Sequence, residues 1–118
     1  MSLVEPVTEE RRAEVLKHWE LAQERLTALL FEEDPAGLVF EAALQADEYE
    51  LEATNILPRL PACKSEPEVQ ALIHQKMHDL VDVKRPQPFE AYSRVAQRVW
   101  LEVVPILREG GIPCSTAL

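Results

Sequence analysis

The sequence predicts an all-α fold, a single domain arranged as a compact bundle of about four helices. Three observations support this prediction. Apolar residues recur every three or four positions in four separate stretches, which places them on one side of a helix. No stretch shows the alternation of apolar and polar residues that marks a β-strand, and only 3 of the 118 residues are glycine. Short links that contain proline separate the stretches, as expected of helices packed side by side.

The first helix is expected from about Thr8 to Leu30 or Phe31. Thr8 can cap its N-terminus, and glutamates in the first turn suit the positive end of the helix dipole. The side expected to be buried comprises Val15, Trp19, Ala22, Leu26 and Leu29. Pro35 and Gly37 then predict a turn. The residues that follow, 38–46, are compatible with an extended connector or with one or two helical turns.

The second helix is expected to begin at Asp47, whose side chain would cap it and pair with Glu50 in a capping box. Its apolar side comprises Tyr49, Ala53, Ile56 and Leu60. Pro58 conflicts with a continuous helix because proline has no backbone N–H to donate. The helix should therefore end near Leu57 or kink there.

The third helix has the clearest start, a capping box formed by Ser65 and Glu68 with a proline in the first turn. It should end near Val83. The fourth helix should run from about Phe89 to Arg108, with a bend at Pro105. A pair of glycines then ends it, and residues 1–7 and 111–118 are expected to be loose termini.

The net charge of −9 is unevenly distributed along the chain. Residues 1–52 hold fourteen acidic and four basic residues, whereas the rest of the chain is nearly balanced. Nucleic acids are bound by basic surfaces, so an excess of acidic residues repels them. The same excess attracts a basic protein. A surface that is merely solvated remains the alternative. With no apolar run of about 18 residues and no leader-like N-terminus, the sequence predicts a cytoplasmic protein without a membrane partner.

No residue pattern predicts catalysis, a cofactor or a metal. Cys63 and Cys114 lack metal-binding spacing and are expected to be reduced, although one disulfide remains possible. His74 and His78 lie four residues apart, but the phase of their helix turns both outward or sideways. No serine lies in a nucleophile elbow and no glycine-rich loop could hold a phosphate, so an enzyme is disfavoured.

Five residues of the first two helices are candidates for a binding face: Glu20, Glu24, Glu48, Tyr49 and Glu52. An aromatic side chain inside an acidic rim suits recognition of a basic protein. Tyr49 also lies in phase with the apolar side of its helix, so packing in the core is the alternative for it.

Two other functions stay open. The four glutamates of this set have a spacing similar to the carboxylates with which all-α nucleotide pyrophosphohydrolases hold magnesium, which would make the protein a metal-dependent hydrolase. Spare apolar surface on the fourth helix would instead suit a homo-oligomeric structural protein.

One segment resembles a family of small, uncharacterised bacterial helical proteins, a domain of unknown function. The pattern is Asp-Pro-x-Gly-aliphatic, then Asp-Glu-Tyr-Asp about ten residues later, then Ile-Leu. It is matched here by Asp34, Pro35, Gly37, Leu38, Asp47, Glu48, Tyr49, Ile56 and Leu57, with Glu50 in place of the last aspartate. The resemblance implies an all-α domain and no established activity. Some similar small acidic proteins act as immunity partners of neighbouring toxins, which implies a basic partner.

Overall fold

The computed structural model describes residues 9–33, 49–80 and 88–112. All regular structure in these ranges is helical, which confirms the predicted all-α bundle of about four helices. The four helical segments are α1 (Glu9–Glu33); α3 (Glu50–Ile56) continuing into the 3₁₀ helix η1 (Leu57–Ala62); α4 (Glu66–Leu80); and a composite of the 3₁₀ helix η2 (Phe89–Tyr92), α5 (Ser93–Arg98), the π-helix η3 (Val99–Val103) and α6 (Val104–Glu109).

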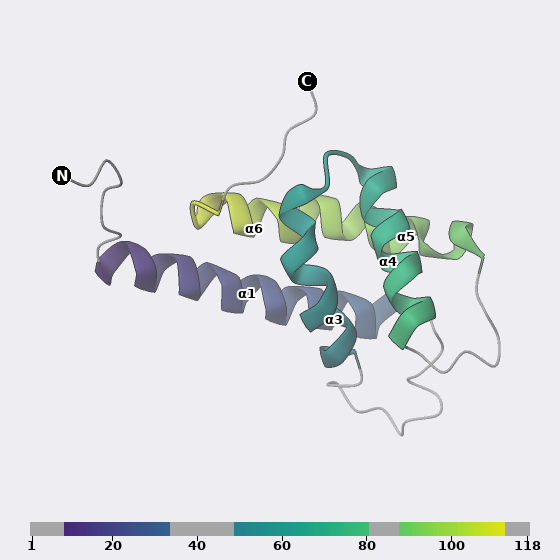
Figure 1. Cartoon of the computed structure of the whole chain (residues 1–118), viewed down its shortest axis with the longest axis horizontal. Helices are drawn as coiled ribbons and strands as arrows, with labels where there is room; N and C mark the ends of the chain where they lie inside the picture. Colours follow the sequence, from purple (N-terminus) through teal and green to yellow (C-terminus); the bar gives the residue numbers. More distant parts are fainter. Residues whose placement is uncertain (1–8, 34–48, 81–87, 113–118) are drawn as a thin grey trace.

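The segments form two pairs that cross each other (Figure 1). Helix α1 runs antiparallel to the composite of α5, η3 and α6, and the antiparallel pair α3 and α4 lies across them. The core fills the space between the pairs. Its largest fully buried members come from all four segments and include Leu26, Tyr49, Ile56, Ile73, Tyr92 and Leu107. Because each segment has one apolar side, a crossing of two pairs buries all four sides at once.

Helix α1 buries its predicted apolar side mainly in its second half. Ala22, Leu26, Leu29 and Leu30 are fully buried, whereas Val15 and Trp19 nearer the N-terminus are only half-buried. The first half approaches the end of α6 at Gly110, where a Cβ atom would overlap His18 and lie 2.7 Å from its Cγ. Glycine at residue 110 therefore leaves the space that the His18 side chain occupies.

The start of α3 differs from the expectation. Tyr49 is the N-cap residue, and its side chain makes no capping hydrogen bond. Glu50 is therefore the first residue of the helix, whereas the predicted capping box made it the third. Asp47 and the ambiguous segment 38–46 lie outside the described residues. The end agrees with the expectation: the α-helix stops at Ile56, and the chain continues as η1 with Pro58 at its start. The missing N–H of Pro58 explains this change of helix type.

Helix α4 begins directly after Ser65, as predicted, but its first hydrogen bonds differ from those of a capping box. The Glu68 carboxylate accepts hydrogen bonds from the Lys64 N–H, at 3.1 Å, and from the Ser65 hydroxyl, at 3.4 Å. In a capping box the carboxylate of the third helical residue accepts from the N–H of the N-cap residue; here it accepts from the N–H one residue earlier. The described part of α4 ends at Leu80. The expected end near Val83 lies beyond it.

The fourth segment is interrupted by a π-helix immediately before Pro105. The Val104 N–H donates to the Val99 carbonyl, five residues back, and Pro105 lies in the first turn of α6. Pro105 predicted a bend in this helix, and the structure has a π-helical turn next to it. The wider turn accommodates a residue without a backbone N–H.

The chain leaves α6 through a Schellman motif centred on Gly111. Gly111 has a φ of 78°, its N–H donates to Arg108, and the Ile112 N–H donates to Leu107, each at 3.0 Å. Ile112 also packs against the core. The expectation of a loose terminus is therefore wrong for residues 111 and 112, since the motif satisfies the last helical carbonyls. None of the helices in the described ranges is long and apolar enough to cross a membrane.

Candidate functional site

The structure divides the five predicted binding residues. Tyr49 and Glu52 are buried, with 0% and 5% of their surface exposed, so a partner cannot reach them from solvent. This corrects the prediction that they form a binding face. Glu20 and Glu24 are exposed on α1 as expected, and Glu48 lies outside the described residues.

The burial of Tyr49 and Glu52 follows from the phase of α3. Tyr49, Glu52, Ala53 and Ile56 are spaced by three, one and three residues, which puts all of them on the side that faces the core. The Ala53 N–H donates to the Tyr49 carbonyl at 2.9 Å and extends the helical bonding pattern back to the N-cap. Packing in the core, the alternative for Tyr49, is the arrangement found.

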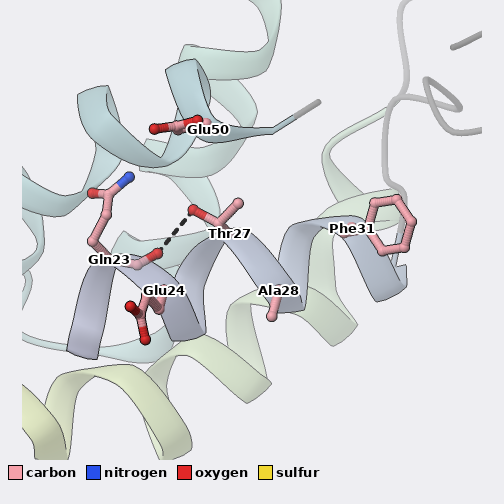
Figure 2. Close-up of a pocket in the computed structure, with 6 residues that line it drawn as sticks. All are labelled: Gln23, Glu24, Thr27, Ala28, Phe31 and Glu50. Atoms are coloured by element: carbon pink, nitrogen blue, oxygen red, sulfur yellow. Dashed lines mark hydrogen bonds between the residues drawn. The ribbon is translucent and has the colours of Figure 1, made fainter. Parts of the chain in front are cut away.

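A groove of about 360 Å³ lies on α1 beside the start of α3 (Figure 2). We call it the acidic groove; it is lined by Gln23, Glu24, Thr27, Ala28, Phe31 and Glu50. Gln23 joins the two helices, because its Nε2 donates to Thr54 Oγ1 at 3.1 Å. A second groove of about 290 Å³ borders α6 and shares Glu24 and Ala28 with the first.

The hydroxyl groups at the acidic groove are used within their own helices. Thr27 Oγ1 donates to the Gln23 carbonyl at 2.8 Å, drawn as a dashed line in Figure 2. Thr54 Oγ1 donates to the Glu50 carbonyl, also at 2.8 Å. Such bonds to the carbonyl four residues back are the ordinary way in which threonine is accommodated inside a helix.

Most carboxylates near the C-terminal end of α1 are neutralised by arginine. Arg98 binds Glu102 at 2.9 Å and Glu32 at 2.7 Å, and Arg94 binds Glu33 at 2.7 Å. The hydrogen bonds of Arg98 to Glu102 and Glu32 raise the pKa of its guanidinium above the ordinary value. The contacts with Glu32 and Glu33 join α1 to the composite fourth segment.

The carboxylates at the acidic groove are different. Glu24 and Glu50, and Glu20 one turn before Glu24, are exposed, and within the described ranges their side chains form no ion pair or hydrogen bond. The structure therefore separates paired from unpaired acids and leaves negative charge beside an apolar groove.

The two histidines of α4 occupy different environments. Their ring centroids lie 4.4 Å apart, and the His74 ring also forms T-shaped contacts with the rings of Tyr92 and Phe89, at centroid distances of 5.4 and 5.8 Å. His74 is half-buried, whereas His78 is exposed. Across the described ranges, no three His, Cys, Asp or Glu residues are placed to hold a metal ion.

Cys63 is buried, and burial, with a smaller contribution from the charge of Glu68, raises the pKa of its thiol. It therefore stays protonated and unreactive near neutral pH. Its Sγ lies 3.7 Å from the Arg59 carbonyl and donates a weak hydrogen bond to it. Cys114, the other candidate for a disulfide, lies outside the described residues.

No known protein family, curated protein or solved structure matches this chain significantly. The resemblance to a bacterial domain of unknown function therefore stays a prediction. The described residues of its pattern, Tyr49, Ile56 and Leu57, are fully buried, so their place in it is explained by packing. The pattern's Asp34–Leu38 and Asp47-Glu48 portions lie outside the described residues.

The sequence alone did not identify most of the acidic groove. Gln23, Thr27 and Phe31 were not candidates, and Glu50 was expected to serve as part of a cap. A signal was nevertheless present: Gln23, Thr27 and Phe31 recur every four residues along the flank of the apolar side of α1. What it lacked was the position of α3, which closes the groove.

Proposed function

We propose that this protein is an interaction module that binds a basic protein at the acidic groove. The observation that supports this proposal is that Glu24 and Glu50, which line an apolar depression, and nearby Glu20 have unpaired carboxylates, while Glu32 and Glu33 at the end of α1 are paired with arginine. A partner whose surface is cationic and partly apolar would complement this combination of unpaired negative charge and exposed apolar area.

The net charge of −9 adds a long-range contribution. It accelerates encounter with a basic partner and slows encounter with acidic molecules such as nucleic acids. The association rate should therefore fall as salt rises, because counterions screen the charges over about 10 Å at 0.1 M ionic strength. The immunity-like version of the proposal, implied by the resemblance described above, makes the partner a basic toxin.

The experiment uses two variants with the same change of net charge. Glu24→Lys/Glu50→Lys reverses the acidic groove, and Glu90→Lys/Glu109→Lys reverses two exposed acids on η2 and α6. Each immobilised protein is exposed to a lysate of the source organism at low and high salt, retained proteins are identified by mass spectrometry, and association rates are then measured with the purified partner. We expect a basic protein to be retained at low salt by the wild type and the second variant only.

Two results would reject the proposal. In one, the wild type retains no basic protein at low salt. In the other, both variants lose the partner equally, because net charge alone would then explain the retention. Circular dichroism spectra of the variants provide the folding control.

Self-association is a second candidate function, favoured by one observation. Leu101 on η3 is 62% exposed and neighbours the half-buried Trp100, which leaves apolar surface on the fourth helical segment as expected for a homo-oligomer. Sedimentation velocity of the wild type and of Leu101→Lys tests it: a dimer that dissociates in the variant supports it, and a wild-type monomer at high concentration rejects it. The magnesium-dependent hydrolase gains less support, because Glu52 is buried.

A further inference from the structure

We propose that the acidic groove is a receptor for one arginine side chain of the basic partner, and that it selects arginine over lysine. This inference rests on the proposed function and adds to it the chemical group that is recognised. Three properties of the groove support it: the kind of hydrogen-bonding atoms it offers, its charge, and the order of polar and apolar residues along it.

The groove offers acceptors to a ligand. The single hydroxyl hydrogen of Thr54 goes to the Glu50 carbonyl, so Thr54 Oγ1 must accept from Gln23, which fixes the orientation of the Gln23 amide. The side-chain carbonyl oxygen of Gln23 then points away from Thr54 and can accept a hydrogen bond from a ligand. The hydroxyl hydrogen of Thr27 is likewise used, by the Gln23 backbone carbonyl.

The carboxylates of Glu24 and Glu50 are acceptors as well, since ionised carboxylates have no hydrogen to donate. The complementary ligand group is therefore a cation with several donors and no acceptor. A guanidinium meets this description with five N–H donors that spread in one plane. A lysine ammonium has three donors at a single point and holds its hydration shell more strongly.

Polar and apolar residues lie at opposite ends of the groove (Figure 2). Gln23 and Glu50 lie on the α3 side of α1, the Glu24 carboxylate is turned to the opposite side of that helix, and the ring of Phe31 lies at the far end, past Thr27 and Ala28. Gln23 and Phe31 are eight residues apart on one helix, or about 12 Å along its axis. A long cationic side chain can lay its methylene groups on Ala28 and the Thr27 methyl while its head reaches the Glu50 carboxylate.

The test uses three capped pentapeptides with glycine at both ends, lysine at positions two and four, and arginine, lysine or citrulline in the centre. The first two have equal charge, and citrulline keeps the shape of arginine without its charge. Binding is followed by chemical-shift changes of the isotopically labelled full-length protein at low ionic strength. We expect the arginine peptide to bind about fivefold more tightly than the lysine peptide, with shifts centred on Thr27, Ala28 and Glu50.

Matched variants locate the selectivity. Glu50→Gln removes one acceptor charge, and Ala28→Trp fills the groove without changing charge; both are exposed positions and should abolish the preference for arginine. The controls are Glu20→Gln, which weakens both peptides alike, and Leu16→Trp, at an exposed position of α1 outside the groove, which should leave the preference intact.

The outcomes separate this inference from the proposed function. Equal binding of the arginine and lysine peptides, with both weakened by salt and by Glu20→Gln, would overturn arginine selection and leave the basic-partner proposal standing. A preference for arginine that survives Ala28→Trp and Glu50→Gln would also overturn it, because the selecting site would lie elsewhere. If no peptide bound even at low salt, the arginine receptor would be rejected, and the lysate experiment alone would decide the basic-partner proposal.

Discussion

Replacing Gly110 by alanine tests the close approach of α6 to α1. The added Cβ would overlap the Cβ of His18, lie 2.7 Å from its Cγ and lie 3.3 Å from its Nδ1. His18 cannot easily yield, because its Nδ1 is 2.8 Å from the Glu14 carbonyl and its side chain is mostly buried. Helix α6 must therefore move away from α1.

The expected cost combines two opposing effects. Overpacking of this kind destabilises a protein by about 1–3 kcal/mol. Because Gly110 has an ordinary φ of −76°, alanine is compatible with its backbone and recovers about 0.4–1 kcal/mol by restricting the unfolded chain. We expect a net loss of about 1–2 kcal/mol in the free energy of unfolding, which corresponds to a fall in Tm of roughly 4–8 °C.

The assay is urea unfolding monitored by circular dichroism, for Gly110→Ala, His18→Gly and the double variant. His18→Gly removes the atoms that collide, so the double variant should be more stable than the sum of the single effects predicts. Gly111→Ala is the control: its positive φ costs about 1 kcal/mol, but no atom lies closer than 3.5 Å, so it should not couple to His18→Gly. A Gly110→Ala variant as stable as the wild type would refute the contact.

Three further predictions concern the core, the ion pairs and the pH dependence. Tyr49→Ala should lower the free energy of unfolding, measured by urea titration, by about 3–5 kcal/mol, because a fully buried aromatic ring is lost. In the same titration the control Glu24→Ala, at an exposed position, should change it by less than about 0.5 kcal/mol. Arg98→Met should destabilise the protein at low salt by breaking its pairs with Glu32 and Glu102; this difference in Tm from the wild type should shrink as sodium chloride rises, and a constant difference would argue against ion pairing. Burial raises the thiol pKa of Cys63 and the hydroxyl pKa of Tyr92, so the unfolded chain loses these protons at a lower pH than the folded one. Stability should therefore be constant at neutral pH and fall as pH rises past the ordinary thiol pKa of about 8.5, and Cys63→Ala should delay this fall in thermal melts recorded from neutral to alkaline pH.

The positions of the helices were predictable because their causes are local. The Ser65 start of α4, the change of helix type at Pro58 and the end of the last helix at two glycines each depend on a few neighbouring residues. The start of α3 was not predicted correctly. Asp47 and Glu50 have the spacing of a capping box, but packing of Tyr49 into the core places the first helical turn two residues later.

The candidate site was predicted only in part. The periodicity of the second helix already put Tyr49 in phase with Ala53 and Ile56, so its burial was the alternative that the pattern supported. Glu52 has the same phase as these residues. Because charged side chains are rarely buried, Glu52 was nevertheless expected at the surface. Gln23, Thr27 and Phe31 gained significance only through the neighbouring helix.

The amino-acid sequence by itself determined an all-helical chain, the apolar side of each helix and an excess of negative charge in the N-terminal half, because periodicity, capping and composition act over short distances along the chain. Only the tertiary structure decided which of the acids are neutralised and which are left unpaired. Arg98 lies 66 residues from Glu32, and Glu50 meets the groove of α1 from another helix. Both relations depend on how the two helix pairs cross, since charges and acceptors act on a partner through their distances in space.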